Sequence, residues 1–159
     1  MRAIVVLALL LIVQPAFAGA RENIHAASKG VETVLGEPLT PAGPFVDPGE
    51  SDEKTFCYDD VTCQAEAAKY VFVQATGHSI RTTVSSRVDP DTYYRICLGI
   101  LAGLTEDVLH PDYVTKTMEG LFQVAASSGR AHTRLGSVEV KVQPAGEFNL
   151  LECDFVRWQ

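Results

Sequence analysis

The spacing of apolar and polar positions changes along the chain, and each change predicts an element of secondary structure. In residues 61–75 apolar side chains recur at helical spacing, and Gly77 follows as a stop signal. The β-prone stretch 70–73 suits a strand, but polar side chains at positions 64, 66 and 69 form a coherent polar face. We therefore expect a helix with an apolar face made of Val61, Ala65, Ala68, Phe72 and Ala75.

The next segment, residues 78–88, alternates with a period of two. Apolar and β-branched side chains fall on one side, and Ser, Thr and Arg side chains fall on the other. Such alternation is typical of a half-buried strand. The buried face of this strand is expected to contain Ile80, Thr82, Val84 and Val88.

A helix is predicted directly after this strand. Asp89 can cap it, and Pro90 suits its first turn. Gly99 and Gly103 lie four residues apart on this helix, so a second helix or a sheet can approach closely there. Its apolar stripe is formed by Cys97, Leu101, Leu104 and Val108.

A second helix over residues 112–127 and a C-terminal β-hairpin complete the pattern. Gly129 ends the helix, valines at positions 138, 140 and 142 then alternate with polar residues, and residues 144–146 form a turn before a last strand over 148–158. The predicted fold class is therefore α+β, with two to three helices packed on a small antiparallel sheet that ends in the hairpin.

The register of the hairpin decides which residues of the last strand are buried. A simple three-residue loop places Glu152 opposite a valine. A bulge at Gly146 instead brings three apolar residues onto the valine face, and it leaves Glu152 and Asp154 exposed beside Arg157. The bulged register is preferred, and its inward residues are Leu151, Cys153 and Phe155.

Residues 1–18 are predicted to be a secretory signal peptide. Arg2 is followed by an apolar run of about 11 residues, and Ala16-Phe17-Ala18 provide small residues at a cleavage site. A membrane-spanning helix needs roughly 20 residues, so the run is too short to be an anchor. We expect a periplasmic or secreted protein with no membrane insertion after cleavage.

The rest of the chain divides into residues 19–55 and residues 56–159. The first part combines a short helix up to Leu35 with a flexible segment rich in Pro and Gly. The second part is expected to be a single compact α+β domain. The length of 159 residues leaves little room for more.

Charge excludes several classes of partner. The formal net charge is −7, and the pI is near 5.0. Nucleic acids and anionic membrane surfaces need a basic face, so we expect neither as a partner.

Four cysteines follow the predicted signal peptide, and an even number in an oxidising compartment favours disulfides. The sequence permits three connectivities. We prefer Cys57–Cys63 together with Cys97–Cys153, because the first pair is close in a loop-like stretch. The C-x5-C spacing does not suit zinc, and the four histidines are scattered.

Acidic pairs are the nearest approach to catalytic chemistry, because paired carboxylates can catalyse hydrolysis. Helix capping and solvent-exposed faces explain each pair better. No serine lies in a G-x-S-x-G motif, and Asp107, His110 and Asp112 form only a loose cluster. We therefore expect no catalytic residue, cofactor or metal. The acidic pairs are Asp59/Asp60, Asp89/Asp91, Glu106/Asp107 and Glu152/Asp154.

Residues Cys97–Gly103, read as CLGILAG, resemble the Cys-x-Gly-Tyr-Ile-x-Gly helix of Tai-type immunity proteins of type VI secretion. The resemblance implies an all-helical periplasmic protein that blocks an imported toxin. Ile100 replaces the aromatic residue of that motif, and the hairpin departs from its all-helical fold. We therefore do not assign the chain to this family.

Together these patterns predict a small, acidic, disulfide-stabilised exported protein. The favoured function is a non-enzymatic binding module that acts on a protein or envelope partner, as an inhibitor or an immunity-like factor. A hydrolase of unfamiliar type and an envelope structural component remain as alternatives. A sheet face with exposed apolar side chains favours binding, and a polar cleft favours an enzyme.

Overall fold

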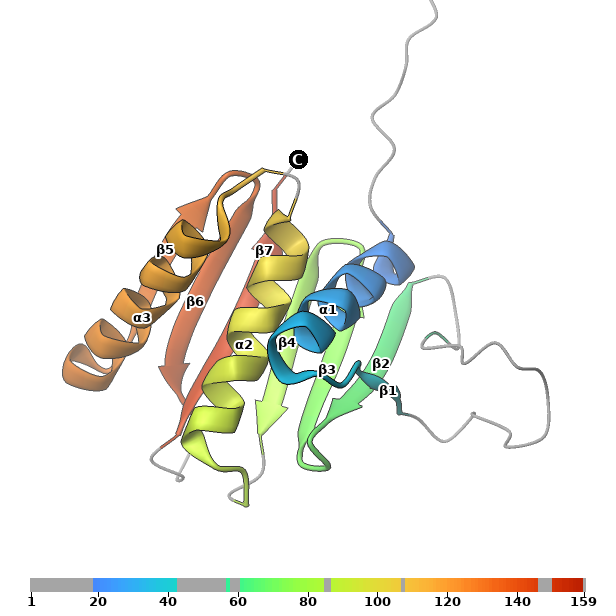
Figure 1. Cartoon of the computed structure of the whole chain (residues 1–159), viewed down its shortest axis with the longest axis horizontal. Coiled ribbons are helices and arrows are strands. Elements are labelled where there is room, and N and C mark those ends of the chain that lie inside the picture. The colour runs from blue at the N-terminus through green and yellow to red at the C-terminus, as the bar shows by residue number, and fades with distance from the viewer. Residues whose placement is uncertain are drawn as a thin grey trace, which may run out of the picture.

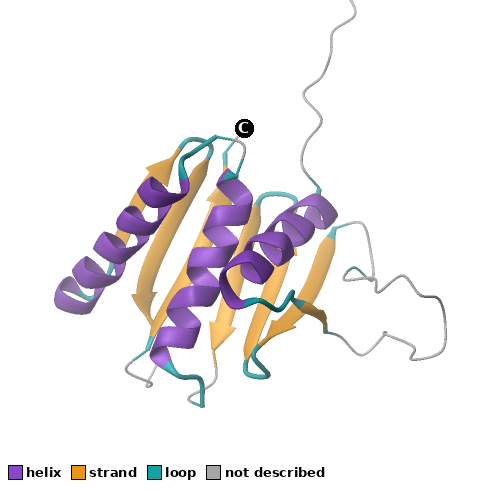
Figure 2. Cartoon of the chain, viewed as in Figure 1, coloured by secondary structure: helices purple, strands orange, loops and turns teal. Residues whose placement is uncertain are grey.

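The computed structural model describes residues 19–42, 57, 61–84, 87–106, 108–145 and 150–158. Three helices pack in one layer on one face of a seven-stranded sheet (Figures 1 and 2). The helices are α1 (Ala20–Leu35), α2 (Pro90–Thr105) and α3 (Pro111–Ser128). The strands are β1 (Thr40–Pro41), β2 (Thr62–Ala67), β3 (Val71–Thr76), β4 (Ser79–Val84), β5 (Ala131–Leu135), β6 (Val138–Pro144) and β7 (Leu151–Arg157).

All strand pairs of the sheet are antiparallel, in the order β1-β2-β3-β4-β7-β6-β5. The C-terminal strand β7 therefore lies between two meanders, and it joins β4 to β6 (Figure 1). The predicted α+β class with a C-terminal β-hairpin is confirmed. The predicted signal peptide and residues 43–56 of the Pro/Gly-rich segment lie outside the described residues.

The helix predicted over residues 61–75 is wrong, because this segment forms the β2–β3 hairpin. The turn between the strands places Ala68 and Lys69 at positive φ, 50° and 67°, without the glycine that marks such turns in a sequence. Alanines that favour a helix alternate here with polar residues on β2. Val61 and Phe72, expected to be buried, are 68% and 54% exposed.

Alternation in β4, β6 and β7 agrees with the prediction. Ile80, Thr82 and Val84 of β4 face the helices, although the strand ends at Val84 and not at Val88. Cys153 and Phe155 lie on the valine face as preferred, opposite the valines at positions 142 and 140. The register differs from that of a one-residue bulge at Gly146, because Pro144 pairs with Leu151.

The helices after β4 begin as their cap residues predict. The Asp89 carboxylate accepts a hydrogen bond from the Thr92 backbone N–H at 2.9 Å, and Pro90 opens α2. Pro111 opens α3, and Gly129 ends it at φ 82°. The N-terminal helix α1 also packs on the sheet, and its Ile24, Ala27 and Val31 are fully buried.

Three glycines allow α1 and α2 to cross at backbone contact. A methyl group on Gly103 would overlap the carbonyl oxygen of Ala26, and one on Gly30 would overlap that of Gly99. The sequence predicted that another element approaches α2 closely at Gly99 and Gly103, and that element is α1. The α1–α2 crossing depends on the absence of these side chains.

Both preferred disulfides are present. Cys57 bridges to Cys63 at a Cα–Cα distance of 4.0 Å, and Cys97 bridges to Cys153 at 6.2 Å. The Cys97–Cys153 disulfide joins α2 to β7 within the core. The all-helical fold implied by the resemblance to Tai-type immunity proteins is wrong, because the described residues form a seven-stranded sheet.

Candidate functional site

The face of the sheet opposite the helices carries a row of polar side chains. Strand pairing aligns one residue from each of five strands across this face: Gln74, Arg81, Asp154, Lys141 and His132. No described helix covers this face, so it is called the open face below (Figure 1). The row alternates in charge at its centre, where a carboxylate lies between two cations.

Asp154 is the most buried charged group of this row. Its carboxylate lies 3.7 Å from the Arg81 guanidinium, and its side chain is only 22% exposed, against 72% for Arg81. Burial raises the pKa of Asp154, and the positive charges of Arg81 and Lys141 oppose that rise only in part. The pKa of Glu152 is raised by burial and by the negative charge of Asp154.

Glu152 and Asp154 are the acidic pair that the fold brings to a shared surface. Their neighbours are not the expected ones, because Arg157 donates to Asn23 Oδ1 of α1 at 3.0 Å, whereas Arg81 approaches Asp154. Alternation along β7 turns Arg157 to the helix side, and pairing of β7 with β4 brings Arg81 opposite Asp154.

Trp158 is an exposed aromatic side chain held in one orientation at the end of β7. Its indole N–H donates to Glu139 Oε2 at 3.0 Å, and its backbone N–H donates to the Ser137 carbonyl at 2.7 Å. The Arg134 guanidinium lies 5.8 Å from the ring centroid, within the range of a cation–π contact. The side chain is nevertheless 47% exposed.

A cavity of about 230 Å³ lies on the helix side, where α1, the end of α2 and the start of α3 meet. Its lining is mostly apolar and includes Val34, Leu98, Leu109 and Val114. Lys29 and Glu106 form an ion pair of 2.8 Å at this cavity, and both side chains are more than half exposed. An exposed pair of this kind contributes little to stability.

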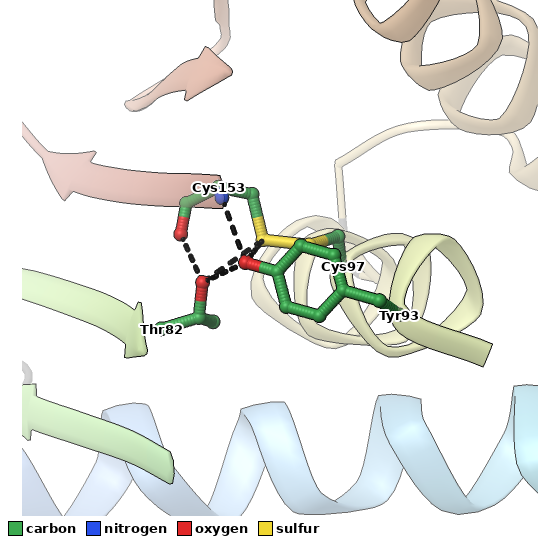
Figure 3. Close-up of a disulfide and its surroundings, with 4 residues drawn as sticks. All are labelled: Thr82, Tyr93, Cys97 and Cys153. Carbon is green, nitrogen blue, oxygen red and sulfur yellow. Dashed lines mark hydrogen bonds between the residues drawn. A yellow bond between two sulfur atoms is a disulfide. The ribbon is translucent and has the colours of Figure 1, made fainter. Parts of the chain in front are cut away.

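The disulfide between α2 and β7 lies beside a buried group of polar atoms (Figure 3). The Tyr93 hydroxyl accepts the Cys153 backbone N–H at 3.0 Å and hydrogen bonds with Thr82, whose hydroxyl donates to the Cys153 carbonyl at 2.7 Å. Burial raises the pKa of Tyr93 to about 12, so the phenol stays protonated. The arrangement satisfies buried backbone groups and is structural.

The remaining acidic candidates have local roles or lie outside the description. Asp89 caps α2, Asp91 lies in its first turn, and Glu106 pairs with Lys29. Asp59, Asp60 and Asp107 are outside the described residues.

The serine and histidine candidates do not form a catalytic arrangement among the described residues. The hydroxyls of Ser127 and Ser128 donate to the Val124 carbonyl at the end of α3, and Ser85 and Ser86 are not described. His110 caps α3 and lies 3.9 Å from Asp112, with both side chains exposed. Within the described ranges, no group of three potential ligands is placed to hold a metal ion.

Comparisons with protein-family models, with curated proteins and with solved structures find no match to this chain. Among the described helices, none is both long and apolar enough to cross a bilayer.

Two features of the open face are missing from the sequence-based prediction. Strand β5 was not expected, although Arg130, His132 and Arg134 alternate before Gly136-Ser137, which is a hairpin signal. Aromatic residues that end a strand are more often core than surface, yet Trp158 is 47% exposed and only Phe155 is buried. The partners of Trp158 lie on β5 and β6, so its environment depends on strand pairing.

Proposed function

We propose that this protein is an exported, non-enzymatic binding module whose open face docks on a protein partner of the cell envelope or its surroundings. The two disulfides support this proposal, because such bonds persist in oxidising compartments. The leader-like sequence of residues 1–18 supports export. An inhibitor or an immunity-like factor fits this description.

The orientation of Trp158 is the observation that carries the proposal. Exposed tryptophan and arginine side chains are enriched among the residues that dominate binding energy. Trp158 is held by Glu139 and stacked against Arg134 before any partner arrives. Binding therefore requires little further loss of side-chain freedom at this position.

The dimensions of the open face suit an interface. The six strands β2 to β7, at ~4.8 Å spacing and about 20 Å long, form a surface of about 600 Å². A stable protein interface uses about 800 Å² from each partner. Paired charges at the centre of the face, such as Arg81 with Asp154, favour a specific partner through electrostatic complementarity.

The proposal is tested by comparing capture of partners by the wild-type protein and two variants. Trp158→Ala removes the proposed anchor, and Val124→Ala is the matched control, because Val124 is similarly exposed, at 52%, on α3. We expect a defined envelope protein to bind wild type and Val124→Ala equally, and to bind Trp158→Ala at least about tenfold more weakly. Equal capture by all three would refute the docking surface.

A hydrolase is the second candidate, because Glu152 and Asp154 share one face of β7 and both have a raised pKa. A carboxyl group that keeps its proton closer to neutral pH suits general acid catalysis. The test measures turnover of envelope glycans and of simple esters by wild type, Glu152→Gln and Asp154→Asn. Turnover that falls more than about 100-fold in either variant supports this candidate, and the absence of turnover in wild type refutes it.

A further inference from the structure

The outer edge of β5 presents backbone donors and acceptors that no described strand pairs. The strand has five residues, contains neither Pro nor Gly, and ends the strand order of the sheet. Exposed edges of this kind are templates for the addition of another strand.

The opposite edge of the sheet is protected. There the terminal strand β1 is only two residues long and contains Pro41. Cys57 also pairs with Cys63 of β2, through a β-bridge and a disulfide, so a second stretch of chain lies along the edge of β2. The two edges therefore differ, and only the β5 edge has the length and composition to accept a partner strand.

Basic side chains line this edge. Arg130, His132 and Arg134 alternate in the sequence and are all exposed, and Lys141 lies opposite His132 on β6. Lys141 pairs with Glu139 at 3.5 Å, so this basic edge is defined as Arg130, His132 and Arg134, and it stands out in a chain with a net charge of −7. Clustered cations in an acidic protein create a local field that attracts negative groups.

A second copy of this chain is a poor occupant of the edge. Two antiparallel β5 strands related by a two-fold axis perpendicular to the sheet keep the open faces on the same side. The even-numbered basic residues then lie opposite one another, for example Arg130 opposite Arg134. Like charges directly opposite on neighbouring strands are destabilising.

We infer that the β5 edge binds an extended acidic segment of a protein partner as an eighth strand of the sheet. The inference rests on the proposed function and names the chemistry of the partner. Main-chain hydrogen bonds to the exposed edge provide affinity, and alternate acidic side chains opposite His132 and Arg134 provide specificity. A carboxylate that reaches Arg134 also changes the surroundings of Trp158, because the guanidinium lies against the indole.

The first experiment uses the purified disulfide-bonded protein and three capped heptapeptides. One alternates Val with Glu, one alternates Val with Lys, and one repeats the Val/Glu sequence with alternate backbone nitrogens methylated. Trp158 is the single tryptophan of the chain, so its fluorescence reports binding. We expect saturable binding of the Val/Glu peptide, and binding weaker by at least about tenfold for the other two.

Variants locate the binding site. Arg130→Glu combined with His132→Glu is expected to weaken binding of the Val/Glu peptide by about tenfold or more, since both changes place like charges opposite the peptide. Lys116→Glu on α3 is the control for charge reversal, because Lys116 is exposed on the helix side. Amide hydrogen exchange in β5 is expected to slow on binding in wild type and in the control.

Several outcomes would overturn the inference. Equal binding of the methylated peptide shows adsorption by charge alone. Equal or tighter binding of an oligonucleotide or of anionic vesicles shows a different partner class, and a concentration-dependent dimer in sedimentation shows that a second copy occupies the edge. The β5 inference alone fails if Trp158→Ala loses a partner that the double variant retains. The proposed function fails as well if every variant retains it.

Discussion

Replacement of Gly103 by alanine tests the close backbone contact between α1 and α2. A methyl group at this position would overlap the Ala26 carbonyl oxygen and lie 2.7 Å from its carbonyl carbon. Both atoms belong to the backbone of α1, so no side-chain rotation relieves the overlap, and α1 must move away from α2. We place the cost at the upper end of overpacking, about 3 kcal/mol.

Helix propensity offsets part of this cost. Alanine is favoured over glycine in a helix by about 1 kcal/mol, so the free energy of unfolding should fall by about 2 kcal/mol in Gly103→Ala. Gly120 on α3 provides the matched control, because a methyl group there has no atom within 4 Å. Gly120→Ala should therefore raise the free energy of unfolding by about 0.5–1 kcal/mol.

Urea denaturation of the disulfide-bonded proteins, followed by circular dichroism, measures both changes. Equal slopes in wild type and variants show that the comparison reports stability and not a change in the surface exposed on unfolding. Opposite signs for the same glycine-to-alanine change are the expected result. A Gly103→Ala protein that is as stable as Gly120→Ala would refute the backbone contact between α1 and α2.

Three further predictions concern the core and the open face. The Tyr93→Phe change leaves the Cys153 N–H without its acceptor, so the free energy of unfolding should fall by about 1–3 kcal/mol. Urea denaturation measures this change, and an unchanged value would contradict the hydrogen bond. Replacing Cys97 and Cys153 with alanine removes the disulfide that closes the longer loop and should lower the free energy of unfolding by about 4.2 kcal/mol. Removing the short-loop disulfide should lower it by about 2.4 kcal/mol. Thermal unfolding measures both changes, and the reverse order would contradict the loop-entropy account. Because the pKa of Glu152 is raised in the folded protein, its contribution to stability is present at acidic pH and is lost as pH rises through that pKa. The Glu152→Gln variant should therefore be more stable than wild type at pH 7, and the difference should disappear toward about pH 4. A stability difference that does not depend on pH would contradict the raised pKa of Glu152.

Much of the helical layer could be predicted from local signals. Asp89 and Pro90 start α2, and Gly129 ends α3, because caps and stops are properties of a few adjacent residues. The disulfide pairing was also preferred correctly. The short pair is close along the chain, which leaves Cys97 and Cys153 as the second pair.

The β2–β3 hairpin and strand β5 could not be predicted in the same way. Apolar residues spaced by two and by four satisfy both a strand and a helix, and the β2–β3 turn uses Ala68 and Lys69 at positive φ. Only pairing with β4 and cover by α1 decide between the alternatives. Tertiary packing thus overrides the local preference.

The candidate site depends most strongly on the tertiary structure. The sequence by itself determined the net charge, the four cysteines, the start of α2, the end of α3 and the presence of one tryptophan, because each is a property of composition or of neighbouring residues. Pairing of β5, β6 and β7 decided that Trp158 lies between Glu139 and Arg134, and that β5 carries an unpaired basic edge. These contacts join residues that are separated along the chain, so their geometry exists only once the sheet has formed.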